Sequence, residues 1–185
     1  MKETIKQAAV SLENFRLPRY HEIPNVGLYL EQVTKYICEY LAPLQDGAIT
    51  GSMVSNYVKK GLVDNPVKKQ YGREQIAYLF FIAVAKNVLS LDELNLFIAR
   101  QKQTYPPKKA YDYFCEELEN ILGFVFGLKA VADVVGVENS QEKEMLRNTN
   151  PHLMEIMPGV IGKAIMRFRK SGIPVIAGGL IETKQ

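Results

Sequence analysis

The stretch ITGSMVSNYVKKGLVDNPVKKQYGREQIAYLF, residues 49–80, decides the fold of this chain. Thr50 stands where an N-cap hydroxyl would accept a backbone N–H, and Gly61 follows the end of a helix that we expect to reach Lys60. A basic turn and a second helical segment come next. This order of helix, basic turn and helix is the layout of a winged helix-turn-helix.

The helix that starts after Thr50 is predicted to be amphipathic. Its apolar positions recur at helical spacing, and they are Met53, Val54, Tyr57 and Val58. The polar residues that remain face outward, and they are Ser52, Ser55, Asn56, Lys59 and Lys60. A face of short polar side chains flanked by lysines is suited to the major groove of DNA, where Asn56 is the candidate partner of adenine.

Positive charge gathers in the same region. The net charge of +3 is too small to indicate a polyanion partner, but its distribution is uneven. From Ser52 to Arg73 a single acid, Asp64, stands against five basic residues: Lys59, Lys60, Lys68, Lys69 and Arg73. A basic loop alone is equally typical of a solvated surface. Beside a capped helix with a polar face, it favours contact with phosphates.

Two tyrosines complete the predicted DNA-binding set. Tyr57 lies on the predicted helix, and Tyr71 ends the basic turn. Tyr57 fits core packing as well as DNA contact, and Tyr71 either packs the wing or donates its hydroxyl to the DNA backbone. Thr50 is included as the residue at the start of the helix.

Composition excludes several other classes of protein. With 185 residues and 47% hydrophobic content, the chain can bury a core. No apolar run approaches the roughly 20 residues needed to span a bilayer, and MKETIKQAAV has no apolar segment behind its charges. We therefore expect a cytoplasmic protein without a membrane segment.

Catalysis, metal and cofactors are not expected. Cys38 and Cys115 lie beside apolar helical stripes without metal-ligand spacing, which indicates buried thiols. His21 and His152 lie in different segments, away from a nucleophile. The acids Glu116, Glu117 and Glu119 are more typical of a solvated helix face than of a catalytic pair.

The rest of the chain supplies an arm and further helices. Residues 1–27 are predicted as a short amphipathic helix and an arm broken by Pro18 and Pro24. Residues 28–105 form the winged helix-turn-helix domain, with helices over about 28–41 and 73–88 and a third that starts at Ser90 with a capping box to Glu93. Residues 106–149 extend the helical part.

The helical extension carries a long apolar stripe. Its members are Tyr111, Phe114, Leu118, Ile121, Leu122 and Val125. The stripe either forms a homodimer or closes its own domain, and the sequence favours neither. After a boundary near Asn150, residues 150–185 are predicted as a βαβ-like tail. The predicted fold is thus mainly α with a short tail of mixed structure.

The segments GLYLEQV, ITGSMVSNYVKKGLV, PVKKQYGREQIAYL and VLSLDEL lie between about residues 17 and 127. Together they resemble a bacterial domain-of-unknown-function family related to the MerR-like regulators. The last three follow the order of recognition helix, GL turn, basic wing ending in an aromatic residue, and paired helices. The resemblance implies a winged helix-turn-helix that binds duplex DNA, usually as a dimer, and a role in transcription.

The tail resembles a different family. PHLMEIMPGVIGKAIMRF and IPVIAGGLIETK are similar to a βαβ piece of the glycerol uptake operon antiterminator family, whose members are phosphate-binding (β/α)₈ barrels. One such unit cannot close an eight-stranded barrel. A phosphate ligand held by the backbone of Gly178 and Gly179 is the weakest of the functional alternatives.

The main alternative to DNA binding is an interaction module. In this hypothesis the tyrosine-rich helices bind a protein partner, and the basic turn only keeps the surface soluble. Salt separates the two, because DNA binding falls steeply with added salt whereas an apolar interface barely responds. The sequence identifies no operator and no small-molecule effector.

Overall fold

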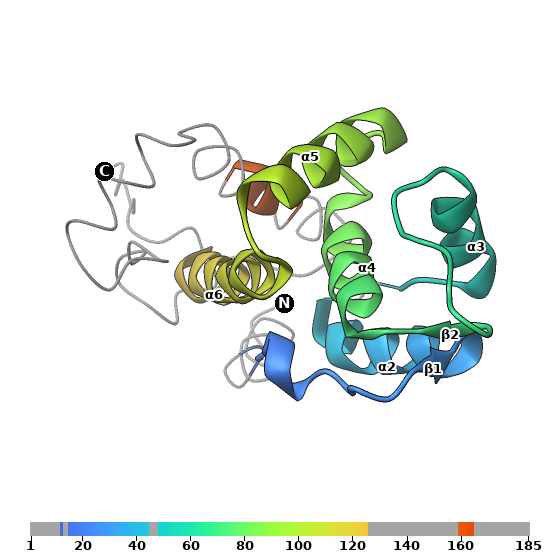
Figure 1. Cartoon of the computed structure of the whole chain (residues 1–185). Helices are drawn as coiled ribbons and strands as arrows, with labels where there is room; N and C mark the ends of the chain where they lie inside the picture. Colours follow the sequence, from blue (N-terminus) through green and yellow to red (C-terminus); the bar gives the residue numbers. More distant parts are fainter. Residues whose placement is uncertain (1–11, 13–14, 45–47, 126–158, 165–185) are drawn as a thin grey trace, which may run out of the picture.

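The computed structural model describes residues 12, 15–44, 48–125 and 159–164. This part of the chain is mainly helical, as predicted, with one small sheet (Figure 1). The elements in chain order are η1 (Tyr20–Glu22), β1 (Leu28–Tyr29), α2 (Leu30–Leu41), η2 (Ala42–Leu44), α3 (Gly51–Lys59), β2 (Gln70–Tyr71), α4 (Arg73–Ala85), α5 (Leu91–Thr104) and α6 (Pro107–Val125).

α4 is the central helix of the fold. Every residue from Ile76 to Ala85 is buried, and α2, α5 and α6 all contact this helix. The helix predicted over 73–88 is found, but it ends three residues early, at Ala85. Neighbours cover it on all sides. A helix that is apolar all round belongs in the centre of a core.

α3 has the start and stop that its sequence predicts. Thr50 is the N-cap, and its side-chain oxygen accepts a hydrogen bond from the Met53 N–H at 3.3 Å. Gly61 adopts a left-handed φ of 77° after the helix. Its N–H donates to the carbonyl of Val58, and the Leu62 N–H donates to that of Tyr57, both at 3.0 Å. These two bonds satisfy the last carbonyls of the helix.

The sheet joins the start of α2 to the segment before α4. β1 and β2 are antiparallel, with Leu28 opposite Tyr71 and Tyr29 opposite Gln70. Val67 also bridges to Gln70, which closes a two-residue turn at Lys68 and Lys69. We call residues 67–71 the hairpin. It occupies the position that the sequence predicts for the wing.

The predicted cap of α5 is confirmed, and so is the apolar stripe of α6 from Tyr111 to Leu122. Ser90 caps α5, its Oγ accepting from the Glu93 N–H while Glu93 accepts from the Ser90 N–H at 2.7 Å. In α6, Tyr111 and Phe114 pack against Phe80 and Phe81 of α4, with ring centroids 6.0 and 5.5 Å apart. Its stripe therefore closes its own domain, the second of the two predicted roles.

The arm is more ordered than its two prolines predict. It contains the 3₁₀ turn η1, and its backbone is held by carboxylates of α6. The Leu17 N–H donates to Glu119 at 2.9 Å, and the Tyr20 N–H donates to Asp112 at 2.7 Å. Arg19 and Glu119 form two parallel bonds of 2.7 Å, and Glu119 raises the pKa of Arg19.

Only a small part of the predicted tail is described. Residues 159–164 are helical, and Val160, Ile161 and Ala164 are buried in the same core cluster as the helices. Lys163 lies close enough to Glu93 of α5 to lower the pKa of that carboxyl, after the stronger effect of its bonds to Ser90. The predicted N-terminal helix, the strands of the tail, Gly178 and Gly179 lie outside the described residues. Within the described part, no helix is long and apolar enough to cross a membrane.

Candidate nucleic-acid interface

α3 and the hairpin lie at one end of the molecule. In Figure 1 both stand at the right-hand edge, on the opposite side of α4 from α6. The apolar side of α3 is held by burial of Val54 and Tyr57 and by packing of Met53 and Val58 against the core. The polar side of the same helix is left facing solvent.

The predicted polar contacts of α3 lie on its exposed face. Ser52, Ser55 and Asn56 are all exposed. The Ser52 hydroxyl is 2.9 Å from that of Thr50, and the Ser55 hydroxyl donates to the carbonyl of Gly51 at 2.8 Å. Among the described residues, the Asn56 side chain makes no hydrogen bond. Its amide can therefore meet an outside partner without breaking a bond to the protein.

The two predicted tyrosines do not belong to that face. Tyr57 and Tyr71 are 4% and 5% exposed, and burial raises the pKa of both phenols. Their inclusion among the DNA contacts is corrected, because neither ring is accessible to a ligand. Tyr57 and Tyr71 are both packed in the core, which is one of the two roles that the sequence allowed for each.

The four predicted lysines form the basic part of the surface. Lys59 and Lys60 end α3, Lys68 and Lys69 form the tip of the hairpin, and all four are exposed. None of them has an ion-pair partner among the residues that the structure describes. Their charge is thus available to a ligand.

Asp64, the single acid between Ser52 and Arg73, forms an ion pair with a lysine of α5. Asp64 lies 3.3 Å from the ammonium group of Lys102 on α5. Gln75 of α4 fixes the same loop, because its side-chain amide donates to the carbonyl of Asp64 at 2.8 Å and accepts from the Gly72 N–H at 2.7 Å. These contacts hold the loop between α3 and the hairpin and place a positive charge from α5 beside its one acid.

Arg73 has a different role from the predicted phosphate contact. Its Nε donates to the carbonyl of Ile23 at 2.8 Å, and its guanidinium also reaches the carbonyl of His21 at 3.3 Å. The group lies over the Tyr20 ring, 5.7 Å from the centroid. Arg73 therefore ties the arm to the start of α4, and this correction follows from a partner 50 residues away in the chain.

Sequence reasoning missed the exposed residues of the small sheet. Tyr29 is 53% exposed and Val67 is 74% exposed, and both pair with Gln70. Their position on one face depends on the pairing of β1 with β2, which are separated by two helices. No local pattern in two strands of two residues indicates that pairing.

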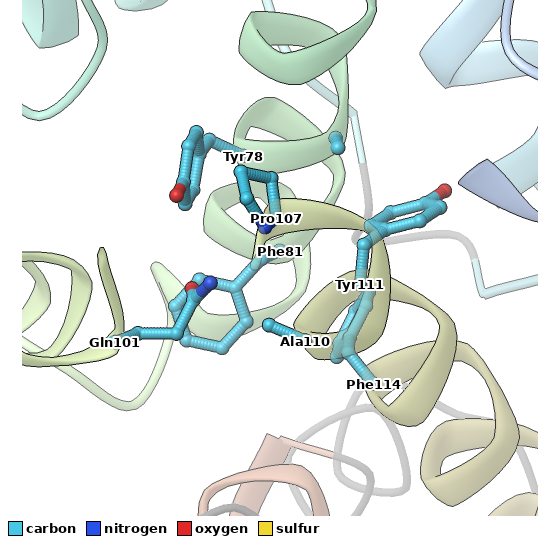
Figure 2. Close-up of a pocket in the computed structure, with 8 residues that line it drawn as sticks. Tyr78, Phe81, Gln101, Pro107, Ala110, Tyr111 and Phe114 are labelled. Atoms are coloured by element: carbon cyan, nitrogen blue, oxygen red, sulfur yellow. The ribbon is translucent and has the colours of Figure 1, made fainter. Parts of the chain in front are cut away.

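A separate pocket lies between α4, α5 and α6 (Figure 2). Tyr78, Phe81, Gln101 and Phe114 line it, and its volume is about 20 Å³. The Tyr78 hydroxyl is buried without a hydrogen-bond partner in the described chain, and burial raises its pKa to about 12. A cavity of this size holds about one water molecule, which is too little for a metabolite.

Residues 18–114 match the model of a protein family described as Domain of unknown function (DUF1836). The match covers more than half of the 185 residues. The chain belongs to this family. Residues 131–185 match a second family model, described as glycerol-3-phosphate responsive antiterminator. No curated protein and no solved structure matches the chain.

The two matches confirm part of what the sequence indicated. The domain-of-unknown-function family and the antiterminator family are both found, and the second match begins at residue 131, before the boundary expected near Asn150. The relation to MerR-like regulators stays a prediction. The DUF1836 match contains α3, the hairpin and all four lysines.

Proposed function

We propose that this DUF1836 protein binds duplex DNA through α3 and the hairpin and acts as a MerR-like winged helix-turn-helix regulator of transcription. The observation that carries the proposal is the set of four exposed lysines that flank the polar face of α3. Within the described chain these lysines have no ion-pair partner, and Asp64, the one acid between Ser52 and Arg73, is paired with Lys102.

The dimensions of α3 suit the major groove. An α-helix with its side chains is about 10–12 Å across, which fits the groove of B-DNA, about 12 Å wide. The nine residues of α3 supply about 13 Å of helix to lie in it. Asn56 would then meet an adenine edge, with Ser52 and Ser55 as further polar contacts. The lysines of α3 and of the hairpin would lie against phosphates and set the orientation of the helix.

The lysines determine how strongly binding depends on salt. Four phosphate contacts give a slope of log K against log salt of about −3.6. Affinity should then fall about 150-fold between 50 and 200 mM salt. An interface made of apolar helices would change little over this range, which is the expected behaviour of an interaction module.

The described helices offer little surface to such a module. Tyr78 of α4 is buried, and the residues of the α6 stripe with described side chains are buried or packed within the protein's own core. A homodimer remains part of the proposal by analogy with MerR-like proteins, but the stripe does not support it. The antiterminator match favours a regulatory role, and a phosphate ligand at Gly178 and Gly179 remains a lesser alternative.

Fluorescence anisotropy with a labelled duplex tests the proposal. The protein is titrated at 50 and 200 mM salt against a random duplex and against DNA from upstream of its own gene. The Lys68→Glu, Lys69→Glu variant should lose binding, whereas Lys108→Glu, Lys109→Glu on α6 makes the same charge change at the opposite side and should not. Absence of binding by the unmodified protein at 50 mM salt would refute the proposal.

A further inference from the structure

The small sheet carries an exposed row of side chains beside the hairpin lysines. Gln70 pairs with Tyr29 on one side and with Val67 on the other. Cross-strand partners point to the same face of a sheet, so these three side chains form a row, which we call the hairpin row. The alternate pair, Leu28 and Tyr71, turns to the core.

The hairpin row is held in place from several directions. The Tyr29 N–H donates to the side chain of Gln32 at 2.9 Å, and Tyr29 is also the N-cap of α2. The arm passes close to the middle of the row, because a Cβ atom at Gly27 would lie 2.7 Å from the Cβ of Gln70. An aromatic and a branched apolar side chain are therefore presented to solvent on a fixed backbone.

The turn next to the row has an unfavourable backbone conformation. Lys68 and Lys69 have φ values of 50° and 65°, a left-handed geometry that two-residue hairpins usually fill with Asn and Gly. Residues in such conformations tend to be kept where they serve a function. Here the conformation places two exposed lysines in the turn between Val67 and Gln70.

We propose that the hairpin row packs against the sugar–phosphate backbone of duplex DNA and supplies a part of the affinity that does not depend on salt. This inference rests on the proposed function. The backbone of DNA combines charged phosphates with apolar deoxyribose surface, and the hairpin combines two lysines at its tip with Val67 before them and Tyr29 on the paired strand. Tyr29 suits such a boundary, since its ring packs on sugar while its hydroxyl can donate to a phosphate.

The positive charge of Lys68 and Lys69 favours DNA over an apolar protein surface as the partner of the hairpin row. A protein partner seated on Tyr29 and Val67 would have to accommodate the two neighbouring ammonium groups, which a polyanion neutralises. A Tyr ring can also stack on an unpaired base, so single-stranded DNA is the other source of the same chemistry. The experiment below separates the two.

Duplex binding is measured for the full chain and for Tyr29→Ser, Tyr29→Phe and Val67→Ser at several salt concentrations. The Tyr29→Ser and Val67→Ser variants should weaken binding by about fivefold to tenfold at every salt concentration, with the slope unchanged. Tyr29→Phe removes only the hydroxyl and keeps the ring, so it measures the contribution of the hydroxyl to binding. The matched control is Leu96→Ser, which removes another exposed apolar side chain, 68% exposed, on α5.

The outcomes separate the inference from the proposed function. If the unmodified protein binds duplex DNA and both serine variants bind equally well, the hairpin row is overturned and the proposed function stands. A loss confined to a single strand of the same sequence would also overturn it, in favour of base stacking. If the unmodified protein binds neither DNA, both proposals fail. Thermal melting of each variant checks that the fold is intact, and Val67→Ser carries the test if Tyr29→Ser melts early.

Discussion

Replacing the hairpin tip by the residues that its turn prefers should stabilise the protein and weaken its binding to DNA. The change is Lys68→Asn with Lys69→Gly, at φ values of 50° and 65°. Left-handed backbone costs an ordinary residue roughly 1 kcal/mol, whereas Asn and Gly tolerate it. Two such residues give about 2 kcal/mol of relief, from which the flexibility of Gly in the unfolded chain removes about 0.5–1 kcal/mol.

The net gain of about 1–1.5 kcal/mol corresponds to a rise in Tm of about 2–6 °C for a chain of this length. Loss of two ammonium groups should reduce the salt slope of DNA binding by about 1.8. Differential scanning calorimetry gives the first quantity, and anisotropy titrations at several salt concentrations give the second.

A charge-matched variant separates strain from charge. Lys68→Gln with Lys69→Gln removes the same two charges but leaves ordinary side chains in the left-handed turn. It should lower the salt slope equally while leaving Tm near that of the unmodified protein. If the Asn–Gly variant melts at or below the Tm of the Gln–Gln variant, the argument from backbone strain is refuted.

Three further predictions concern residues whose roles the structure assigns. Arg73→Gln should cost about 1.5–3 kcal/mol of stability by calorimetry, because it removes charged hydrogen bonds to Ile23 and His21. An unchanged Tm with a reduced salt slope would instead restore Arg73 as a phosphate contact. Gly61→Ala should lower Tm by about 2–4 °C, since φ is 77° there and Ala pays about 1 kcal/mol; an unchanged Tm would show that the turn relaxes. Burial raises the pKa of Glu117 above its ordinary 4.5, so the folded state holds the proton more tightly than the unfolded state. The resulting penalty is absent below the unfolded pKa and grows as pH rises through the folded value. Glu117→Gln should therefore raise Tm at pH 7 and have no effect near about pH 4; an equal gain at both pH values would contradict the burial argument.

The helix boundaries could be predicted where a local chemical signal marks them. Thr50 and Gly61 define α3, and Ser90 with Glu93 starts α5, because each signal involves residues within one or two turns. The end of α4 is marked less clearly. Lys86 and Asn87 interrupt the apolar run after Ala85, but Val88 and Leu89 resume it, so the sequence predicted three residues too many.

Residue roles that depend on distant partners could not be predicted. Arg73 differs in no local respect from a phosphate-binding residue beside a basic turn, and only the carbonyl of Ile23, 50 residues earlier, gives it another role. Tyr71 is buried because β2 pairs with β1, and α4 is covered on all sides because α2, α5 and α6 surround it. In each case a tertiary contact that the local sequence does not indicate decides the role.

In the hairpin row, the fold determines which positions are exposed but does not by itself determine which residues occupy them. Pairing of Leu28 with Tyr71 directs that pair to the core, and the alternation of strands then directs Tyr29, Gln70 and Val67 to the opposite face. Folding requires that these positions be exposed, but it does not require an aromatic or branched apolar residue at them. Aromatic and β-branched residues also favour a strand backbone and stabilise cross-strand pairs, so the sheet itself gives one reason for Tyr29 and Val67. Contact with a ligand that also accepts the charge of the neighbouring lysines is the second reason that we propose, and the serine variants separate the two, because Tm reports the sheet and affinity reports the ligand.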